Sequence, residues 1–245
     1  MEASNFYNFR IINESKHLLG IQYSVSTPNS ETILFLPVWR PGRYEEANFA
    51  KNIMSFEITD ASDNPLKFHK VSKSSWSVNT SEVKEIKVNY SYFAGKLDAG
   101  STYINENQVF INPVNCCLYT EEAMHSPCTI KLELPRNFMV ATSLPLQKKY
   151  TYKASSFDEL ADSPVLASLD LKHEQFTSGK IKFHLWFHGL SRYDIDTIKG
   201  DFEKFIQYQL KVFKSFPGKE FHFIYQLPSY KLYHGVEHLN STVIA

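Results

Sequence analysis

The sequence predicts a mainly β protein that continues into an α/β segment. An antiparallel β-sandwich is expected over residues 1–168, and the start of a second domain over residues 169–245. Two observations predict the sandwich: apolar and polar residues alternate in many short segments, and turn residues separate these segments at short intervals. A third is the aromatic content, 19 Phe and 14 Tyr in 245 residues, which favours sheet because aromatic side chains suit a pleated, half-buried surface.

Alternation with a period of two is clearest at residues 21–25, 86–92 and 130–134. In each segment the apolar side chains fall on one face and the polar ones on the other, as in antiparallel strands that cover a core. Turn signals separate the strands at Thr27-Pro28-Asn29, Arg40-Pro41-Gly42, Asp63-Asn64-Pro65 and Asp98-Ala99-Gly100. Many short strands punctuated in this way are typical of a β-sandwich.

The pattern changes near residue 155. Ser156 and Glu159 have the spacing of a capping box, which predicts a short helix that ends at Pro164. Residues 181–187 then alternate like a strand, and residues 221–227 do so again. The segment between these two strands reads as a helix.

That helix is predicted from apolar residues that recur at steps of three and four. They are Ile195, Ile198, Phe202, Phe205, Ile206, Val212 and Phe213. Asp194 is the expected N-cap and Pro217-Gly218 the expected stop. Strand, helix and strand in succession are typical of the opening of an α/β domain, so we place the boundary near residues 165–178.

Composition excludes some classes of function. Lys plus Arg equals Asp plus Glu at 26 each, and without a basic stripe to neutralise phosphates a nucleic-acid partner is not expected. No apolar run approaches the roughly 20 residues that span a bilayer, so no membrane span is expected. The start, Met1 to Asn5, is acidic and polar and unlike a signal peptide. The compartment stays open between cytoplasm and periplasm.

Three cysteines, Cys116, Cys117 and Cys128, are expected to be free thiols in or near the core. Their number is odd, and a bridge between the adjacent pair would be strained.

The histidines do not predict a metal site. His173 and Glu174 begin like the His-Glu-x-x-His zinc motif, but Thr177 stands where the second histidine must be. His184 and His188 are four residues apart in a strand-like segment, and four residues along a strand span about 13 Å. That separation is too large for one zinc ion. We therefore expect no metal ligand in this chain, and His184 and His188 to be solvated or interfacial sheet histidines.

One stretch near the C-terminal end, residues 233–241, combines features that suit peptide binding. Gly235 would let a substrate backbone approach closely, and an exposed edge strand there could pair with an extended peptide. Glu237, beyond Val236, could bind a protonated amine through a charge-assisted hydrogen bond. The residues alone leave the alternative of a merely solvated surface glutamate.

Three stretches, in order along the chain, resemble parts of one known family. Residues 39–44 (Trp-Arg-Pro-Gly-Arg-Tyr, running on to residues 49–53) resemble a Trp-x-Pro-Gly-x-Tyr signature of a front domain. Residues 157–164 resemble the segment that joins this domain to a catalytic one. Residues 235–241 (Gly-Val-Glu-His-Leu-Asn-Ser) resemble a Gly-Gly-Leu-Glu-His block. The chain thus resembles the glycyl aminopeptidase family of gluzincin-type zinc metallopeptidases.

The resemblance implies a β-sandwich front domain followed by a truncated thermolysin-like catalytic domain. It implies that Glu237 holds the free N-terminus of a peptide substrate, and that Gly235 and Val236 belong to the same substrate-binding strand. His234 departs from the family, which more often has a second glycine there. For the full-length protein it implies zinc and aminopeptidase activity. This chain carries neither the zinc ligands nor the catalytic base, so we expect it to bind no zinc and to be inactive alone.

The last residues, 241–245, form an apolar segment without a cap, so we expect the chain to be a fragment. An exposed apolar patch around Val236, Leu239 and Val243 is then expected, with self-association through that truncated edge. The alternative function is a free-standing β-sandwich module that binds carbohydrate or protein. Its aromatic platform would consist of Trp76, Tyr103 and Trp186.

Overall fold

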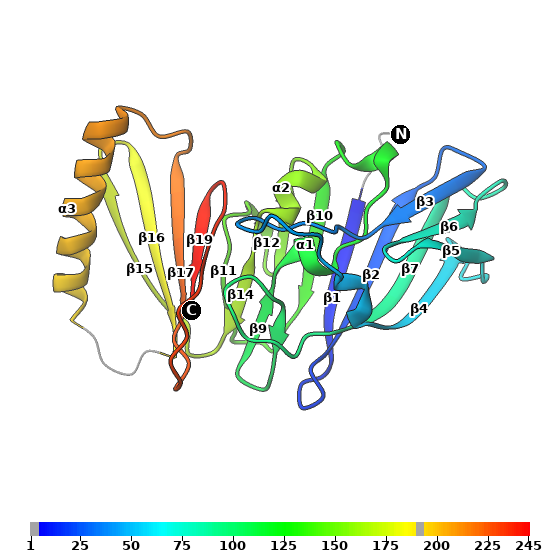
Figure 1. Cartoon of the computed structure of the whole chain (residues 1–245), viewed down its shortest axis with the longest axis horizontal. Helices are drawn as coiled ribbons and strands as arrows, with labels where there is room; N and C mark the ends of the chain where they lie inside the picture. The colour runs from blue at the N-terminus through cyan, green and yellow to red at the C-terminus, as the bar shows by residue number, and fades with distance from the viewer. Residues whose placement is uncertain (1–4, 190–193) are drawn as a thin grey trace.

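The computed structural model of the chain describes residues 5–189 and 194–245. Its strands form four sheets, and helix α3 (Ile195–Phe213) lies on the outer side of the five-stranded one (Figure 1). The predicted mainly β class, with an α/β segment at the C-terminal end, is confirmed.

The largest sheet has seven strands and contains the segments with the clearest alternation. In spatial order they are β12 (Leu146–Lys148), β13 (Thr151–Ala154), β10 (Cys128–Glu133), β1 (Asn5–Asn13), β2 (Leu18–Ser26), β7 (Glu85–Phe93) and β4 (Ile53–Asp60). Neighbours are antiparallel except β1 and β10, which are parallel.

Two smaller sheets and several short helices cover one face of this sheet, the face that carries the main hydrophobic core. One sheet is β3 (Glu31–Phe35), β6 (Ser75–Asn79) and β5 (Phe68–Ser72); the other is β11 (Met139–Ala141), β14 (Val165–Ser168), β9 (Gln108–Ile111) and β8 (Tyr103–Ile104). The helical turns are η1 (Phe49–Asn52), α1 (Pro113–Cys116), η2 (Glu121–Ala123) and α2 (Phe157–Ala161). The main hydrophobic core lies between these layers.

All three cysteines are free and buried in this part of the molecule, as predicted. Burial raises the pKa of the Cys128 thiol to about 12. All three thiols are buried away from reagents and are therefore structural side chains.

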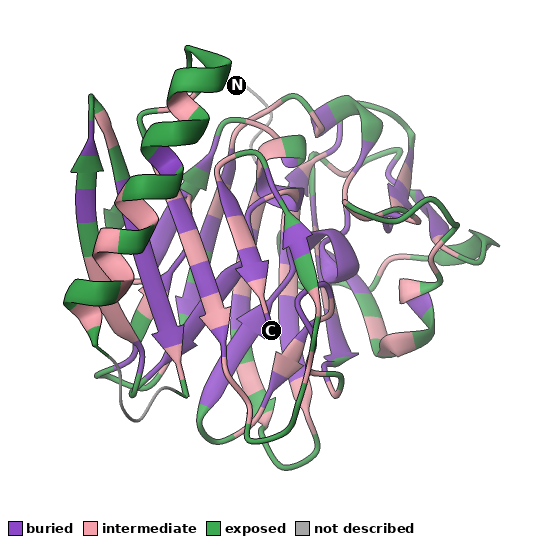
Figure 2. Cartoon of the chain, turned by 60° about the vertical axis from the view of Figure 1, so that its left-hand side comes forward, coloured by how far each residue is buried: buried purple, intermediate pink, exposed green. Residues whose placement is uncertain are grey.

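The fourth sheet, with five strands, forms the α/β segment. Its order is β15 (Lys172–Ser178), β16 (Ile181–His188), β17 (Glu220–Gln226), β19 (Ser241–Ile244) and β18 (Gly235–Glu237). The three central strands are parallel, and β15 and β18 are antiparallel edges. A parallel pair needs a crossover connection, and α3 connects β16 to β17. Figure 2 shows α3 across one face of this sheet, with its outer side exposed.

Both predicted helices form. In α2, Ser156 accepts a hydrogen bond from the Glu159 N–H, as the capping box requires. In α3, Asp194 is the N-cap and accepts a hydrogen bond from the Thr197 N–H. The helix ends at Lys214, which has a left-handed backbone (φ 61°), before the expected stop at Pro217. No helix in the described residues is long and apolar enough to cross a bilayer.

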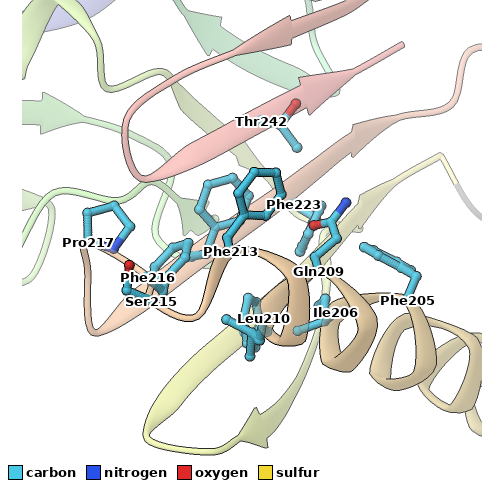
Figure 3. Close-up of a pocket in the computed structure, with 12 residues that line it drawn as sticks. Phe205, Ile206, Gln209, Leu210, Phe213, Ser215, Phe216, Pro217, Phe223 and Thr242 are labelled. Carbon is cyan, nitrogen blue, oxygen red and sulfur yellow. The ribbon is translucent and has the colours of Figure 1, made fainter.

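The apolar stripe of α3 is only partly buried. Ile206 is buried, but Val212 and Phe213, in the last turn, are exposed. There the side chains border a groove of about 530 Å³ between α3 and the sheet (Figure 3). Phe205, Leu210, Phe213, Phe216 and Phe223 are among its lining residues.

The predicted apolar patch at the C-terminal edge is wrong for two of its three residues. Leu239 is exposed, but Val236 and Val243 are only 2% and 0% exposed. Both pack with Phe110 and Leu166, because the five-stranded sheet lies against the four-stranded one. Self-association through that edge stays a prediction, now without two of the three apolar residues on which it rested.

The aromatic platform of the alternative function does not form either. Trp76 is buried in the main core and stacks on Phe56 at 4.8 Å between ring centroids. Trp186 is buried in the layer between the two sheets, and Tyr103 lies beside His17. Tyr103 and Trp186 pack in one cluster, but Trp76 belongs to the main core, so the three rings do not form one exposed platform.

The buried tyrosines predict loss of stability at alkaline pH. Burial raises the pKa of Tyr152 and of Tyr225 to about 12, against about 10 in an unfolded chain. Between these values the unfolded chain has lost protons that the folded chain keeps, so rising pH favours unfolding. This stabilisation is full below about pH 10 and lost as the pH rises through about 12. Urea unfolding midpoints should fall between about pH 9 and pH 11; a constant or rising midpoint would contradict the prediction.

Candidate functional site

Strand β18 is a free edge of the five-stranded sheet in the described part of the chain. It pairs only with β19, in the register Val236 opposite Val243. His234 and Ala245 exchange backbone hydrogen bonds, and the His238 N–H donates to the Ser241 carbonyl. Because paired and unpaired positions alternate in an antiparallel ladder, the N–H and C=O groups of Gly235 and Glu237 point to the open side. This edge can accept an extended peptide as a further strand.

The predicted site residues have different exposures along β18. Val236 is buried, whereas Gly235 and Glu237 are exposed. The nearest atom to a Cβ built on Gly235 is the Val243 carbonyl oxygen at 3.9 Å, so the glycine leaves open space beside the strand. The strand thus presents a carboxylate and an unobstructed backbone on one accessible side.

The first of the three family-like segments meets Glu237 directly. Gly42 lies under its carboxylate: a Cβ on Gly42 would lie 3.3 Å from Glu237 Oε2 and 3.4 Å from Oε1. Gly42 also has a φ of +70°, a backbone conformation that favours glycine. The Pro-Gly pair at residues 41–42 therefore forms a turn that leaves room for the carboxylate.

The second family-like segment anchors the end of β18. Asp162, the C-cap residue of α2, lies 2.8 Å from the buried His238 through Oδ1 and Nδ1. Its Oδ2 accepts a hydrogen bond from the Leu239 N–H, also at 2.8 Å. These two contacts attach the turn between β18 and β19 to the end of helix α2, and this attachment fixes the position of Glu237.

A buried guanidinium lies behind the strand. Arg40 packs on Gly100, where a Cβ would lie 1.4 Å from Arg40 Nη1 and 3.3 Å from Val236 Cγ2. Burial lowers the pKa of Arg40, and the nearby Asp98 opposes this effect. Burial alone would raise the pKa of Asp98, but hydrogen bonds from Lys96 and the Gly100 N–H outweigh it and hold that pKa below its usual value. Asp98 is therefore ionised and provides a negative charge near Arg40.

The histidines beside Glu237 do not form a metal site. His234 Nδ1 is 3.7 Å from Asp98 Oδ1, whereas His238 Nδ1 is 2.8 Å from Asp162 Oδ1. The two imidazoles therefore contact different carboxylates at opposite ends of β18. Arg40 and Asp162 lie within the family-like segments, but the sequence predicted no role for either. Their partners lie far away in the chain, and such contacts leave no local sequence pattern.

The other histidines are arranged as the strand geometry predicts. His184 and His188 are not brought together: His188 Nδ1 lies 2.6 Å from Asp170 Oδ1. His184 instead contacts His173 on β15 and stacks on His222 on β17. Both are interfacial, on the face of the sheet that carries Trp186. The sequence did not predict His222 as a neighbour of His184, because the two residues lie on different strands.

Comparison with known proteins places this arrangement in a family. Residues 7–169, more than half of the chain, match the family described as Peptidase M61 N-terminal domain. No curated protein gives a significant match.

Solved structures give two kinds of likeness. The structure of an aminopeptidase N family protein from Idiomarina loihiensis has a TM-score of 0.91 and 28% identity, over 98% of this chain and 42% of that one. A substrate-bound mutant of an M1 zinc metallopeptidase from Deinococcus radiodurans has a TM-score of 0.54 and 11% identity, over 100% of this chain and 59% of that one. The second likeness shows the fold alone.

The chain spans less than half of the Idiomarina protein and about three fifths of the Deinococcus one. The predicted resemblance to the front part of the gluzincin aminopeptidases is confirmed. With its N-terminal domain matched and its layers reproduced in a related structure, the chain belongs to the M61 peptidase family.

Proposed function

We propose that this chain is the front portion of a zinc metallo-aminopeptidase, in which β18 binds an extended peptide and Glu237 binds its protonated N-terminus. One observation carries the proposal: two segments far apart in the sequence support an exposed carboxylate on a free strand edge. Residues 39–44 lie against Glu237 itself, and residues 157–164 hold the end of its strand, residues 235–241. An ordinary solvated glutamate needs no such support from distant segments.

The chemistry of the two groups fits. A substrate backbone that pairs with the open edge of β18 places its first residue at a defined register. The Glu237 carboxylate can then accept charge-assisted hydrogen bonds from the amine, which are shorter and about twice as strong as neutral ones. An acetylated N-terminus lacks the positive charge and gains little from the same carboxylate. The arrangement therefore favours removal of residues from a free N-terminus.

Zinc is implied for the full-length family members, but the residues around Glu237 do not fit a catalytic zinc ion. His234 contacts Asp98 and His238 contacts Asp162. Neither imidazole therefore converges with the Glu237 carboxylate on one ion-binding position. We derive no catalytic step through zinc here. The chain is accordingly proposed to be inactive alone, with the catalytic ligands in the remainder of a longer protein, as its 42% coverage of the Idiomarina relative supports.

The test is replacement of Glu237 by glutamine and by alanine in the whole enzyme. For substrates with a free amine we expect kcat/KM to fall by about tenfold to a hundredfold, because a hydrogen bond to a charged group contributes about 1.5–3 kcal/mol. For N-acetylated peptides we expect little change. The same assay on the present chain alone should show no turnover.

Glu57→Gln is the matched control, because Glu57 is also an exposed carboxylate on an edge strand, β4. This substitution should leave kcat/KM unchanged for both free-amine and N-acetylated substrates. An equal loss on free and acetylated substrates would assign Glu237 a structural role, and turnover by this chain alone would refute its proposed inactivity.

A further inference from the structure

Three imidazoles lie side by side on the inner face of the five-stranded sheet. His184 on β16 is opposite His222 on the parallel neighbour β17, and His173 on β15 lies beside them. Ring centroids are 4.3 Å apart for His184 and His222 and 5.1 Å for His173 and His184, with planes within 10°. His173 also stacks on Trp186 at 3.7 Å. Because the planes of His184 and His222 are nearly parallel, one of the two rings must rotate before both can direct a nitrogen to the same ion.

One polar atom of this group has no hydrogen-bond partner. His184 Nε2 is buried and unpaired among the described residues, and Glu220 Oε2 lies 3.5 Å from it. That separation is longer than an ordinary N–H···O bond. The other ring nitrogen, Nδ1, lies 2.9 Å from His173 Nε2. When His184 donates Nδ1–H to His173, its Nε2 lone pair and the Glu220 carboxylate face each other, an arrangement that a cation between them stabilises.

We propose that His184, Glu220 and His222 form a binding site for one divalent transition-metal ion. One ligand atom from each residue lies within 4.8 Å of the others. Ligands of a tetrahedral ion with bonds of about 2.0–2.2 Å are about 3.3–3.6 Å apart, and His184 Nε2 and Glu220 Oε2 already have this separation at 3.5 Å. Two imidazoles and one carboxylate suit zinc, cobalt, nickel or copper better than magnesium or calcium.

The surroundings support binding. His173 would act as the hydrogen-bond acceptor that orients a metal-ligating histidine through its second nitrogen. Burial lowers the pKa of His222 to about 3 and also lowers that of His184, so both rings are neutral near pH 7. The Glu220 side chain is 49% exposed and gives an ion access from solvent. Lys182 Nζ, 3.3 Å from Glu220 Oε1, is a competing cation that lowers affinity.

Trp186 supplies a reporter. Its indole N–H donates to His222 Nδ1 at 3.1 Å. A metal bound at Nδ1 replaces this hydrogen bond, and a metal bound at Nε2 moves the ring proton to Nδ1, where it faces the indole N–H. Either mode changes the environment of Trp186, at some cost in affinity.

The test titrates the tag-free chain with Zn²⁺ in a calorimeter and with Ni²⁺ while Trp fluorescence is recorded. We expect one ion per chain, and Ni²⁺ quenching that is lost in Trp186→Phe. His184→Gln, His222→Gln and Glu220→Gln should each weaken binding at least about tenfold. Lys182→Met should strengthen it. His188→Gln is the matched control, because His188 is on the same strand and face but pairs with Asp170.

Binding that is absent in the unaltered chain, or that His188→Gln weakens as much as His184→Gln, overturns the proposal. Glu220 is half-exposed, so Glu220→Gln should fold even if a histidine variant does not; unchanged affinity in that variant also overturns it. The readouts are metal binding and fluorescence, so the outcome is independent of whether Glu237 binds an amine. The proposal departs from the expectation, drawn from the sequence, that this chain binds no metal.

Discussion

Replacing Phe110 by alanine is expected to lower the free energy of unfolding by about 3–5 kcal/mol. Phe110, on β9, is fully buried between the four-stranded and five-stranded sheets. There it packs in one cluster with Trp186, Ile224 and Val236. Truncation leaves a cavity that neither sheet can fill, because both are held by their own ladders and by layers on their other faces.

Urea unfolding followed by far-UV circular dichroism measures the effect, and hydrogen exchange shows where it acts. Protection should be lost first in β17 and β19, whose side chains Ile224 and Val243 share the cluster. Phe213→Ala is the control: Phe213 is 73% exposed at the last turn of α3 and should change stability by only about 0.5 kcal/mol. Equal effects of the two substitutions would mean that the layers are not packed as described.

Replacing Asp162 by alanine is expected to lower the free energy of unfolding by about 2–3 kcal/mol. Asp162 contacts the buried ring of His238 and accepts from the Leu239 N–H, both at 2.8 Å. Without the carboxylate, a buried imidazole nitrogen and a backbone N–H lose their partner, and the loss of a partner is more costly than a typical hydrogen bond is stabilising. In the whole enzyme the variant should also raise KM, because β18 is no longer held in place.

Asp162→Asn keeps one acceptor and should recover part of the lost stability. Asp158→Ala is the control on the same short helix, where the exposed carboxylate lies in the first turn and interacts with the helix dipole, a contribution of about 0.3–1 kcal/mol. If Asp162→Ala is no more destabilising than Asp158→Ala, the anchor of β18 is not energetically significant.

The sequence determined the local elements. The strands predicted over residues 21–25, 86–92 and 181–187 lie within β2, β7 and β16. The one predicted over residues 221–227 matches β17 except for its last residue, and the helix starting after Asp194 is α3. Periodicity sufficed because it reflects a contrast between two faces of the same element, which neighbouring residues record. The three segments that resemble the family were likewise legible residue by residue, since each is contiguous.

Only the tertiary structure decided which of these elements meet. Val236 and Val243 are buried because a second sheet lies against them, and no residue near them in the sequence carries that information. His184 was compared with His188, about 13 Å along the strand, although neighbouring strands are only about 4.8 Å apart and His222 lies directly across the ladder. Glu237 has its turn at Gly42 and its anchor at Asp162 for the same reason. Register and layer packing set the distances between residues far apart in the chain, and these distances decide where a site can form.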